Sequence, residues 1–227
     1  MELNLIQKVV IWAPPILLAI TLHEVAHGWV ARLFGDATAY VMGRLTLNPI
    51  KHVDPVGTVA LPAVLIILGS PFIFGWAKPV PVHFGNLNRP KRDMVWVALA
   101  GPAANLAMAV GWTAITAVGL ALQPDLAYIG EPLMLMGAAG VVINMVLMVL
   151  NLVPIPPLDG GRVAVGLLPQ PFSRWVGYLE PVGLPILLVL LFTGLLGTLI
   201  GVPIFALASL FLGLAGMDLM TFLQFLQ

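Results

Sequence analysis

The sequence predicts an all-α membrane protein that crosses the bilayer several times. Of its 227 residues, 60% are hydrophobic and 9% are charged, whereas soluble domains are roughly 45–50% apolar and about 25% charged. The apolar residues form six runs, each close to the ~20 residues that span a bilayer: Val9–Ala31, Val56–Phe74, Met94–Leu122, Leu133–Val153, Pro181–Ile200 and Val202–Phe225. We expect five full transmembrane helices plus one re-entrant segment, or six helices.

The composition also excludes several classes of protein. Ten Lys and Arg balance ten Asp and Glu, so no nucleic-acid partner is expected. The chain has no Cys, which excludes disulfides and thiolate zinc sites. The first eight residues lack the pattern of a removable signal peptide. We expect one domain over residues 1–227, with a core at about 5–175 and a C-terminal helix pair at 176–227.

The basic residues indicate which side of the membrane each loop faces. All but Lys8 lie in two stretches of the chain: Arg32, Arg44, Lys51, Lys78, Arg89, Lys91, Arg92, Arg162 and Arg174. The loop 123–132 carries Asp125 and Glu131 and no basic residue. Because Lys and Arg concentrate in cytoplasmic loops, residues 32–92 and 160–175 should face the cytoplasm and the loop 123–132 the outside.

The second apolar run, Val56–Phe74, has cytoplasmic flanks on both sides and should therefore enter and leave on the same side. It also contains five helix interrupters: Gly57, Pro62, Gly69, Ser70 and Pro71. Broken backbone at membrane depth is tolerated where protein or a water-filled cavity covers it. This favours a re-entrant segment, and a full crossing with a tolerated proline is the alternative.

Two stretches beside this run, 40–47 (YVMGRLTL) and 78–84 (KPVPVHF), alternate like strands. They could pair as a small β-hairpin or sheet at the cytoplasmic interface, with Pro79 and Pro81 confining the second to an edge. Such an edge can accept an extended peptide as an added strand. An irregular interfacial loop is the alternative interpretation.

The first apolar run contains the motif H-E-V-A-H, from His23 to His27. A spacing of four residues places both imidazoles on one helical face, where they can bind a metal with Glu24 beside them. At 1.5 Å per residue, His23 lies about 13 Å from Arg32, within the inner leaflet. Ionisable residues inside a membrane are costly and mark functional sites.

A zinc site needs a third protein ligand. His52 and His83 fall in predicted cytoplasmic loops, so Asp159 in N-L-V-P-I-P-P-L-D-G-G-R is the better candidate. Three prolines precede it and prevent a regular helix. Arg162 follows at once, which places Asp159 at a depth comparable with that of His27. If both motifs lie at the cytoplasmic ends of their helices, those helices run in the same direction, and only one full crossing can separate them. A re-entrant segment at residues 56–74 satisfies this condition.

The paired motifs resemble the signature of the site-2 proteases, a family of intramembrane zinc metalloproteases. The resemblance covers roughly residues 15–165 and implies one zinc per chain, held by His23, His27 and Asp159, with Glu24 as the general base. The family's upstream Asn matches Asn151, and its G-P-x-x-N motif matches Gly101, Pro102 and Asn105. The chain is similar to short bacterial and archaeal members without PDZ or CBS domains, and it adds the 56–74 segment.

The amide side chains have two interpretations. Asn151 is a candidate donor to the oxyanion of the reaction. The alternative for Asn151, and for Asn105 and Asn144, is hydrogen bonding between helices in an apolar bundle. His52 and Asp54 could guard the cytoplasmic entrance or bind a second metal, although a solvated loop is the more ordinary explanation. A gate is implied as well, and the Gly-rich joint 197–203 of the C-terminal helices is one candidate.

The expected function is zinc-dependent cleavage of a transmembrane protein substrate within the lipid bilayer of a prokaryotic cell, with the active site toward the cytoplasm. An ion or metal transporter that uses intramembrane His, Glu and Asp is an alternative. A transporter usually shows inverted repeats with paired broken helices, and none is detectable in the sequence. A catalytically silent protein that binds transmembrane segments is the third class. The oligomeric state is left open.

Overall fold

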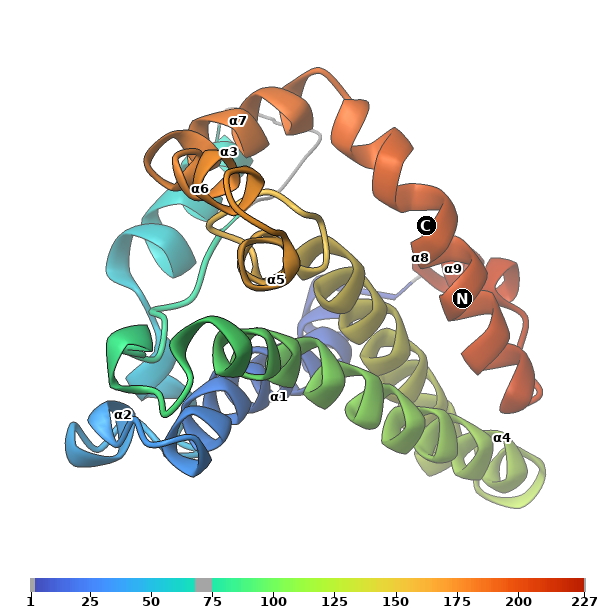
Figure 1. The fold of residues 1–227 in the computed structure, drawn as a ribbon. Coiled ribbons are helices and arrows are strands. Elements are labelled where there is room, and N and C mark those ends of the chain that lie inside the picture. Colours follow the sequence, from blue (N-terminus) through green and yellow to red (C-terminus); the bar gives the residue numbers. More distant parts are fainter. Residues whose placement is uncertain (1–2, 68–74, 227) are drawn as a thin grey trace.

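The computed structural model describes residues 3–67 and 75–226, and most of these residues are helical. The elements in chain order are α1 (Leu5–Leu33), α2 (Thr38–Val41), η1 (Pro49–His52), η2 (Pro55–Ala60), α3 (Leu61–Ile67), η3 (Phe84–Asn86), α4 (Pro90–Asn151), α5 (Asp159–Leu167), α6 (Phe172–Gly177), α7 (Glu180–Phe192), α8 (Leu195–Leu214) and α9 (Leu219–Leu226). Figure 1 shows that α1 lies against the long α4, with α5 to α7 at one end and α8 and α9 along the other. The predicted all-α class is confirmed for the described residues.

Three helices of the described chain, α1, α4 and α8, are long and apolar enough to span a membrane. The 62 residues of α4 would extend about 93 Å as one straight helix, three times the thickness of a hydrocarbon core. Instead α4 is kinked at Leu126, where the backbone is non-helical, and it folds into a hairpin of two arms (Figure 1). The arms match the predicted runs 94–122 and 133–153, and their joint is the predicted outer loop.

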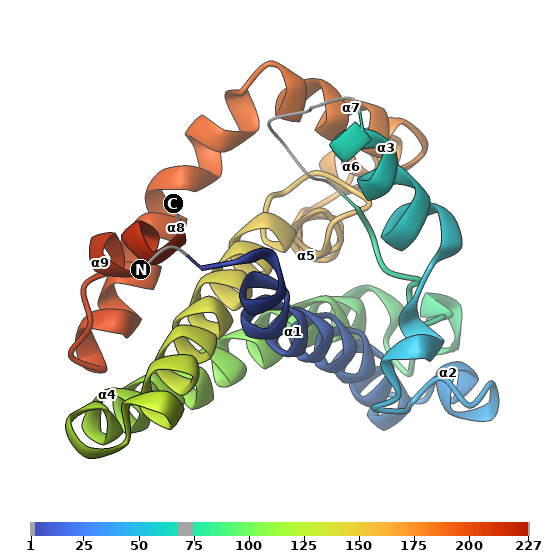
Figure 2. The same cartoon turned by 180° about the vertical axis from the view of Figure 1, so that it is seen from behind.

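The N-terminal end of α1 packs against the C-terminal end of the chain. A capping box starts α1, because the Asn4 side chain accepts from the Gln7 N–H and the Gln7 side chain accepts from the Asn4 N–H, both at 2.9 Å. The Trp12 ring then lies 6.1 Å from the fully buried Phe222 ring of α9. Seen from behind in Figure 2, the described residues before α1 accordingly run toward α9. This contact belongs to a core cluster that also includes residues of α4 and α8.

The C-terminal helices break at a different place from the predicted joint at 197–203. The break lies at Gly194, whose φ of 77° is left-handed, a conformation that favours glycine. Pro203 lies inside α8, and a second left-handed glycine, Gly216 with φ 85°, separates α8 from α9. The predicted joint at 197–203 is therefore wrong. The breaks between α7, α8 and α9 lie at the glycines with positive φ, and not where glycines are most frequent.

The predicted β-hairpin of residues 40–47 and 78–84 is wrong: the described chain contains no strand. Residues 38–41 form α2, and 78–83 are extended without a partner strand. The two stretches still meet, but a side chain joins them, because the Arg44 Nη2 donates to the Lys78 carbonyl at 3.0 Å. The prolines at 79 and 81 have no N–H to donate to a ladder, and the N–H groups of Val80 and His83 donate to carboxylates.

One of these carboxylates, Asp36, ties the end of α1 to the 83–86 turn. It is 1% exposed and accepts from the His83 N–H at 2.7 Å, the Asn86 amide at 3.2 Å and the Thr38 N–H at 3.1 Å. Burial alone would raise the pKa of Asp36, but hydrogen bonds from Thr38, His83 and Asn86 outweigh it and hold the pKa below its ordinary value. The carboxylate therefore stabilises the folded chain in its ionised form.

The segment predicted to re-enter the membrane leaves and returns at neighbouring points. It begins with η2 and α3, and residues 68–74, including Gly69, Ser70 and Pro71, lie outside the described residues. On its return the Trp76 N–H donates to the Gly57 carbonyl at 3.1 Å, and the Lys78 N–H donates to the His52 carbonyl at 2.9 Å. This is the geometry that entry and exit on one side require. The re-entry itself stays a prediction.

Candidate metal centre

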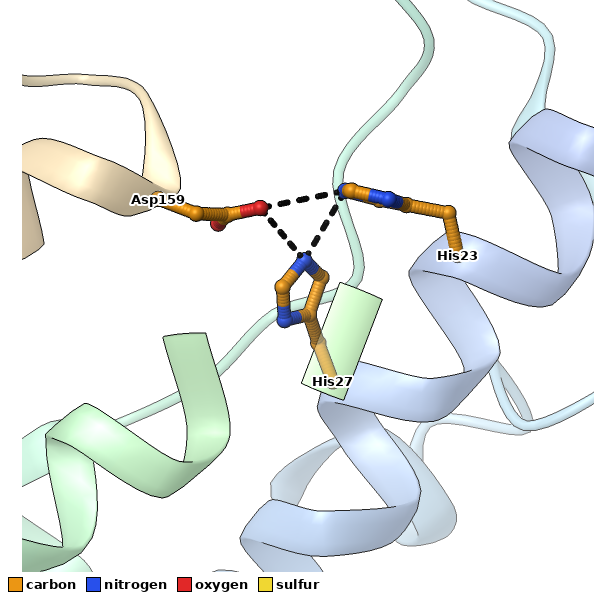
Figure 3. Close-up of side chains that lie close together, drawn as sticks. All are labelled: His23, His27 and Asp159. Carbon is orange, nitrogen blue, oxygen red and sulfur yellow. Dashed lines mark hydrogen bonds and ion pairs between the residues drawn. The ribbon is translucent and has the colours of Figure 1, made fainter. Parts of the chain in front are cut away.

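Three side chains from two distant parts of the sequence converge on one point. His23 and His27 lie one turn apart on α1, and Asp159 reaches them from the start of α5 (Figure 3). The Nε2 atoms of the two histidines are 3.0 Å apart. Asp159 Oδ2 lies 3.2 Å from the Nε2 of His23 and 3.3 Å from that of His27. The structure thus brings together the three residues that the sequence predicts as metal ligands.

The other ring nitrogen of each histidine is held by α4. His23 Nδ1 lies 2.6 Å from Asn105 Oδ1, and His27 Nδ1 lies 2.7 Å from the Val97 carbonyl. A carbonyl can only accept, so His27 Nδ1 carries the proton. The orientation of the Asn105 amide follows from a chain of bonds. Asn105 Nδ2 donates to Asn144 Oδ1 at 2.9 Å, and Asn144 Nδ2 donates to the Gly140 carbonyl at 2.8 Å.

Both imidazoles, when neutral, therefore direct an Nε2 lone pair at the carboxylate oxygen of Asp159. The three side chains are 9–12% exposed, and Asp159 Oδ2 is buried without a hydrogen-bond donor. Three buried acceptors facing one another are satisfied by a cation. In a tetrahedral zinc site with bonds of about 2.0–2.2 Å, ligand atoms lie about 3.3–3.6 Å apart. The observed separations of 3.0–3.3 Å lie at or just below the short end of this range, and the two-nitrogen, one-oxygen donor set fits zinc.

A tight turn between α4 and α5 delivers Asp159. The proline-rich segment 152–158 forms turns rather than helix, and Asp159 is the first residue of α5, where a carboxylate is favoured by the helix dipole. A Cβ on Gly160 would collide with the backbone of Leu152 and Val153. A Cβ on Gly161 would collide with the backbone before Pro157. The two glycines after Asp159 thus allow α5 to pack directly on the turn.

A second close approach occurs at Gly101 on the first arm of α4. A Cβ at this position would overlap the ring atoms of both His23 and His27. Because Gly101 lacks a side chain, α4 can lie close enough for Asn105 and the Val97 carbonyl to reach the histidines. Gly101 lies against both rings and Asn105 bonds His23, so the two residues that the sequence links through G-P-x-x-N act on the same site.

The predicted catalytic residues Glu24 and Asn151 line the same cavity as the three predicted metal ligands, a cavity of about 320 Å³. Glu24 Oε2 accepts from the Val80 N–H at 2.7 Å. Asn151 is half-buried, and its Nδ2 donates to the Leu147 carbonyl one turn earlier at 2.9 Å. One N–H of the Asn151 amide is thus occupied within its own helix, and the amide has a second.

The remaining histidines lie apart from the centre. His52 is 2% exposed, and its Nε2 donates to the Thr46 carbonyl at 3.0 Å, so it is a buried residue rather than part of a solvated loop. His83 is exposed. Asp54 caps η2 by accepting from the Val56 and Gly57 N–H groups. Neither His52 nor Asp54 belongs to the metal-binding group found among the described residues.

Three contributors to the site are not identified by the sequence. The Val97 carbonyl and the Val80 N–H are backbone groups, so their residue types give no signal. Arg162 lines the cavity, places its guanidinium carbon 4.7 Å from the Phe84 ring centre and lies 3.5 Å from Glu180 Oε1. Arg162 could have been identified from the sequence, because it follows Asp159 by three residues and therefore lies on the same side of α5.

Comparison with known proteins finds relatives that are named as zinc metalloproteases. The chain is 38% identical over 181 residues to the Bacillus subtilis protein named "Putative zinc metalloprotease YwhC", covering 79% of each chain. It is 34% identical over 184 residues to the Mycolicibacterium smegmatis "Putative zinc metalloprotease Rip2", covering 78% of this chain and 64% of the relative. The Mycobacterium tuberculosis protein of the same name is 35% identical over 148 residues, 63% of this chain and 52% of the relative. No protein-family model and no solved structure matches.

Proposed function

This chain belongs to the site-2 protease family of zinc metalloproteases, and on that premise we propose that it is a zinc-dependent endopeptidase acting within the membrane. Its substrate is a protein with a transmembrane segment, and the bond cleaved lies within or near that segment. The observation that carries the proposal is the convergence of three buried lone-pair atoms, two of them on the apolar helix α1, beside the carboxylate of Glu24.

His23, His27 and Asp159 would hold one zinc. Zinc, when bound, would polarise the scissile carbonyl and increase the acidity of water. Glu24 is the general base: its carboxylate takes a proton from the attacking water as the new C–O bond forms, and it then gives this proton to the leaving nitrogen as the C–N bond breaks. Asn151 is the candidate donor to the oxyanion, because it lines the same cavity and its amide has a second N–H besides the one that donates to Leu147.

The site would act at the cytoplasmic side of a prokaryotic membrane. Arg32 at the end of α1 lies about 13 Å from His23 along the helix axis, and nine of the ten basic residues flank the same side of the predicted topology. α1 also exposes large apolar side chains, including Leu17 and Leu18 at 43% each, as expected for a helix in contact with lipid. A substrate helix in the bilayer could approach this depth.

Cleavage in liposomes tests the proposal. We would reconstitute the wild type, Glu24→Gln and the matched control Glu131→Gln with a transmembrane test substrate, and measure both zinc per chain and cleavage. We expect about one zinc in all three, cleavage by the wild type and the control, loss of cleavage with a chelator, and a rate at least 100-fold lower for Glu24→Gln. Cleavage that survives Glu24→Gln, or wild-type protein that binds no zinc, would refute the mechanism.

A further inference from the structure

An extended segment, residues 78–83, crosses the edge of the catalytic cavity, and we call it the strap. Its residues 79–82 line the cavity together with Glu24. Val80 lies between Pro79 and Pro81 and therefore supplies the single N–H of this tripeptide. That N–H donates to Glu24 Oε2 at 2.7 Å, and Val80 is 6% exposed. A hydrogen bond to a carboxylate is charge-assisted and short, as observed here.

The strap is fixed on both sides of Val80. Before Val80, the Lys78 N–H donates to the His52 carbonyl at 2.9 Å and the Lys78 carbonyl accepts from Arg44 at 3.0 Å. After Val80, the His83 N–H donates to the buried Asp36 at 2.7 Å. These bonds hold the strap in place independently of Glu24. The Val80 N–H is therefore a fixed donor toward which the flexible Glu24 side chain is drawn.

The Val80 side chain adds a third point of attachment. A Cβ on Gly28 would overlap a methyl group of Val80 as well as one of Leu45, so both side chains pack directly on α1 at Gly28. Gly28 lies four residues after Glu24, on the same face of the helix. The strap thus covers the Glu24 side of α1, while the metal ligands occupy the neighbouring face.

We propose that the main-chain N–H of Val80 is a positioning group for the general base. It holds Glu24 Oε2, which leaves Oε1 to accept the proton of the attacking water. This inference rests on the proposed function. A glutamate side chain has several rotatable bonds, and catalytic groups must be held to within about 0.5 Å. Because a misplacement of about 1 Å can cost on the order of 100-fold in rate, loss of this donor should lower kcat.

Val80→Pro removes the N–H, and Val80→Ala keeps the N–H while shortening the side chain. We expect kcat of Val80→Pro to fall about 10- to 100-fold below that of Val80→Ala, with KM of the two variants within threefold of each other and zinc per chain equal to that of the wild type. Equal kcat in the two variants would show that the Val80 N–H does not position Glu24. A change confined to KM would show that the strap binds substrate without positioning Glu24. Either result overturns the proposal.

A second variant covers the case in which Val80→Pro does not fold. Gly28→Ala should push Val80 off α1 and lower kcat at least tenfold with zinc retained. Gly111→Ala is the matched control, because a Cβ there meets nothing within 4 Å. An unchanged kcat in Gly28→Ala would contradict the proposal. A wild type that cleaves no substrate refutes the proposed function itself, whereas an active wild type with unaffected strap variants refutes only the role of Val80.

Discussion

Replacing Asn105 with leucine tests how the metal centre is held in place. Asn105 is fully buried, and its Oδ1 lies 2.6 Å from His23 Nδ1. Its Nδ2 donates to Asn144 Oδ1 at 2.9 Å and to the Ala19 carbonyl at 3.4 Å. Leucine has a similar volume and no polar atom. The variant therefore removes the acceptor that orients His23 and leaves Asn144 Oδ1 without its donor.

The two losses have separate magnitudes. Removing the outer hydrogen bond of a metal-ligating histidine typically weakens metal binding about 10- to 100-fold, which corresponds to about 1.4–2.7 kcal/mol. Leaving Asn144 Oδ1 buried and unpaired should lower the free energy of unfolding by about 1–3 kcal/mol. Replacing Asn144 with leucine as well removes the unpaired oxygen, so the double variant should recover stability but not zinc affinity.

Zinc affinity is measured by competition with a chelator, and stability by thermal unfolding of the metal-free protein in detergent. Asn48→Leu is the control, because Asn48 is exposed and only caps η1. If Asn105→Leu is destabilised while its zinc affinity equals that of the wild type, Asn105 merely joins helices and our account of His23 is wrong. If the double variant regains zinc affinity together with stability, the account of His23 is likewise wrong, because zinc binding then does not need the Asn105 oxygen.

Three further predictions concern the surroundings of the site. Gly101→Ala places a Cβ against both histidine rings, so we expect it to lose zinc at concentrations that saturate Gly111→Ala; equal zinc content would contradict the close packing of α4 on the centre. The pKa of Asp36 is lowered in the folded protein, so its contribution to stability is complete above the unfolded pKa and disappears as pH falls through the folded one. Asp36→Asn should therefore lower the Tm at pH 7, and its difference from the wild type should shrink below about pH 4; a difference independent of pH would refute this. Gly85→Cys and Asp125→Cys, introduced singly into this cysteine-free chain, should be labelled from opposite sides of the membrane, and labelling from one side would refute the topology.

The grouping of His23, His27 and Asp159 could be predicted from the sequence because two features of the sequence point to it. His23 and His27 share a helical face by their spacing, and no Cys competes with Asp159 as the third ligand. The matching depths of the two motifs then required their helices to run in the same direction. The structure agrees, since the folded α4 returns the chain to the end of the molecule where His27 lies.

The surroundings of the ligands could not be predicted, because they depend on backbone groups and on contacts between distant segments. The alternating pattern of residues 78–84 indicated a strand. The prolines and the two carboxylates that take the Val80 and His83 N–H groups instead leave this segment extended and unpaired. Similarly, the glycines near 197–203 gave no indication that the left-handed residue would be Gly194. The number of glycines in a segment does not tell which one of them adopts a positive φ.

Zinc stoichiometry in ligand variants tests the central claim most directly. Zinc per chain would be measured in purified wild type, His23→Ala and His83→Ala under identical conditions. The account predicts about one zinc per chain in the wild type and almost none in His23→Ala. It also predicts about one zinc in His83→Ala, because the exposed imidazole of His83 lies outside the centre. Zinc retained by His23→Ala, or lost from His83→Ala, would contradict the assignment of the metal centre to His23, His27 and Asp159.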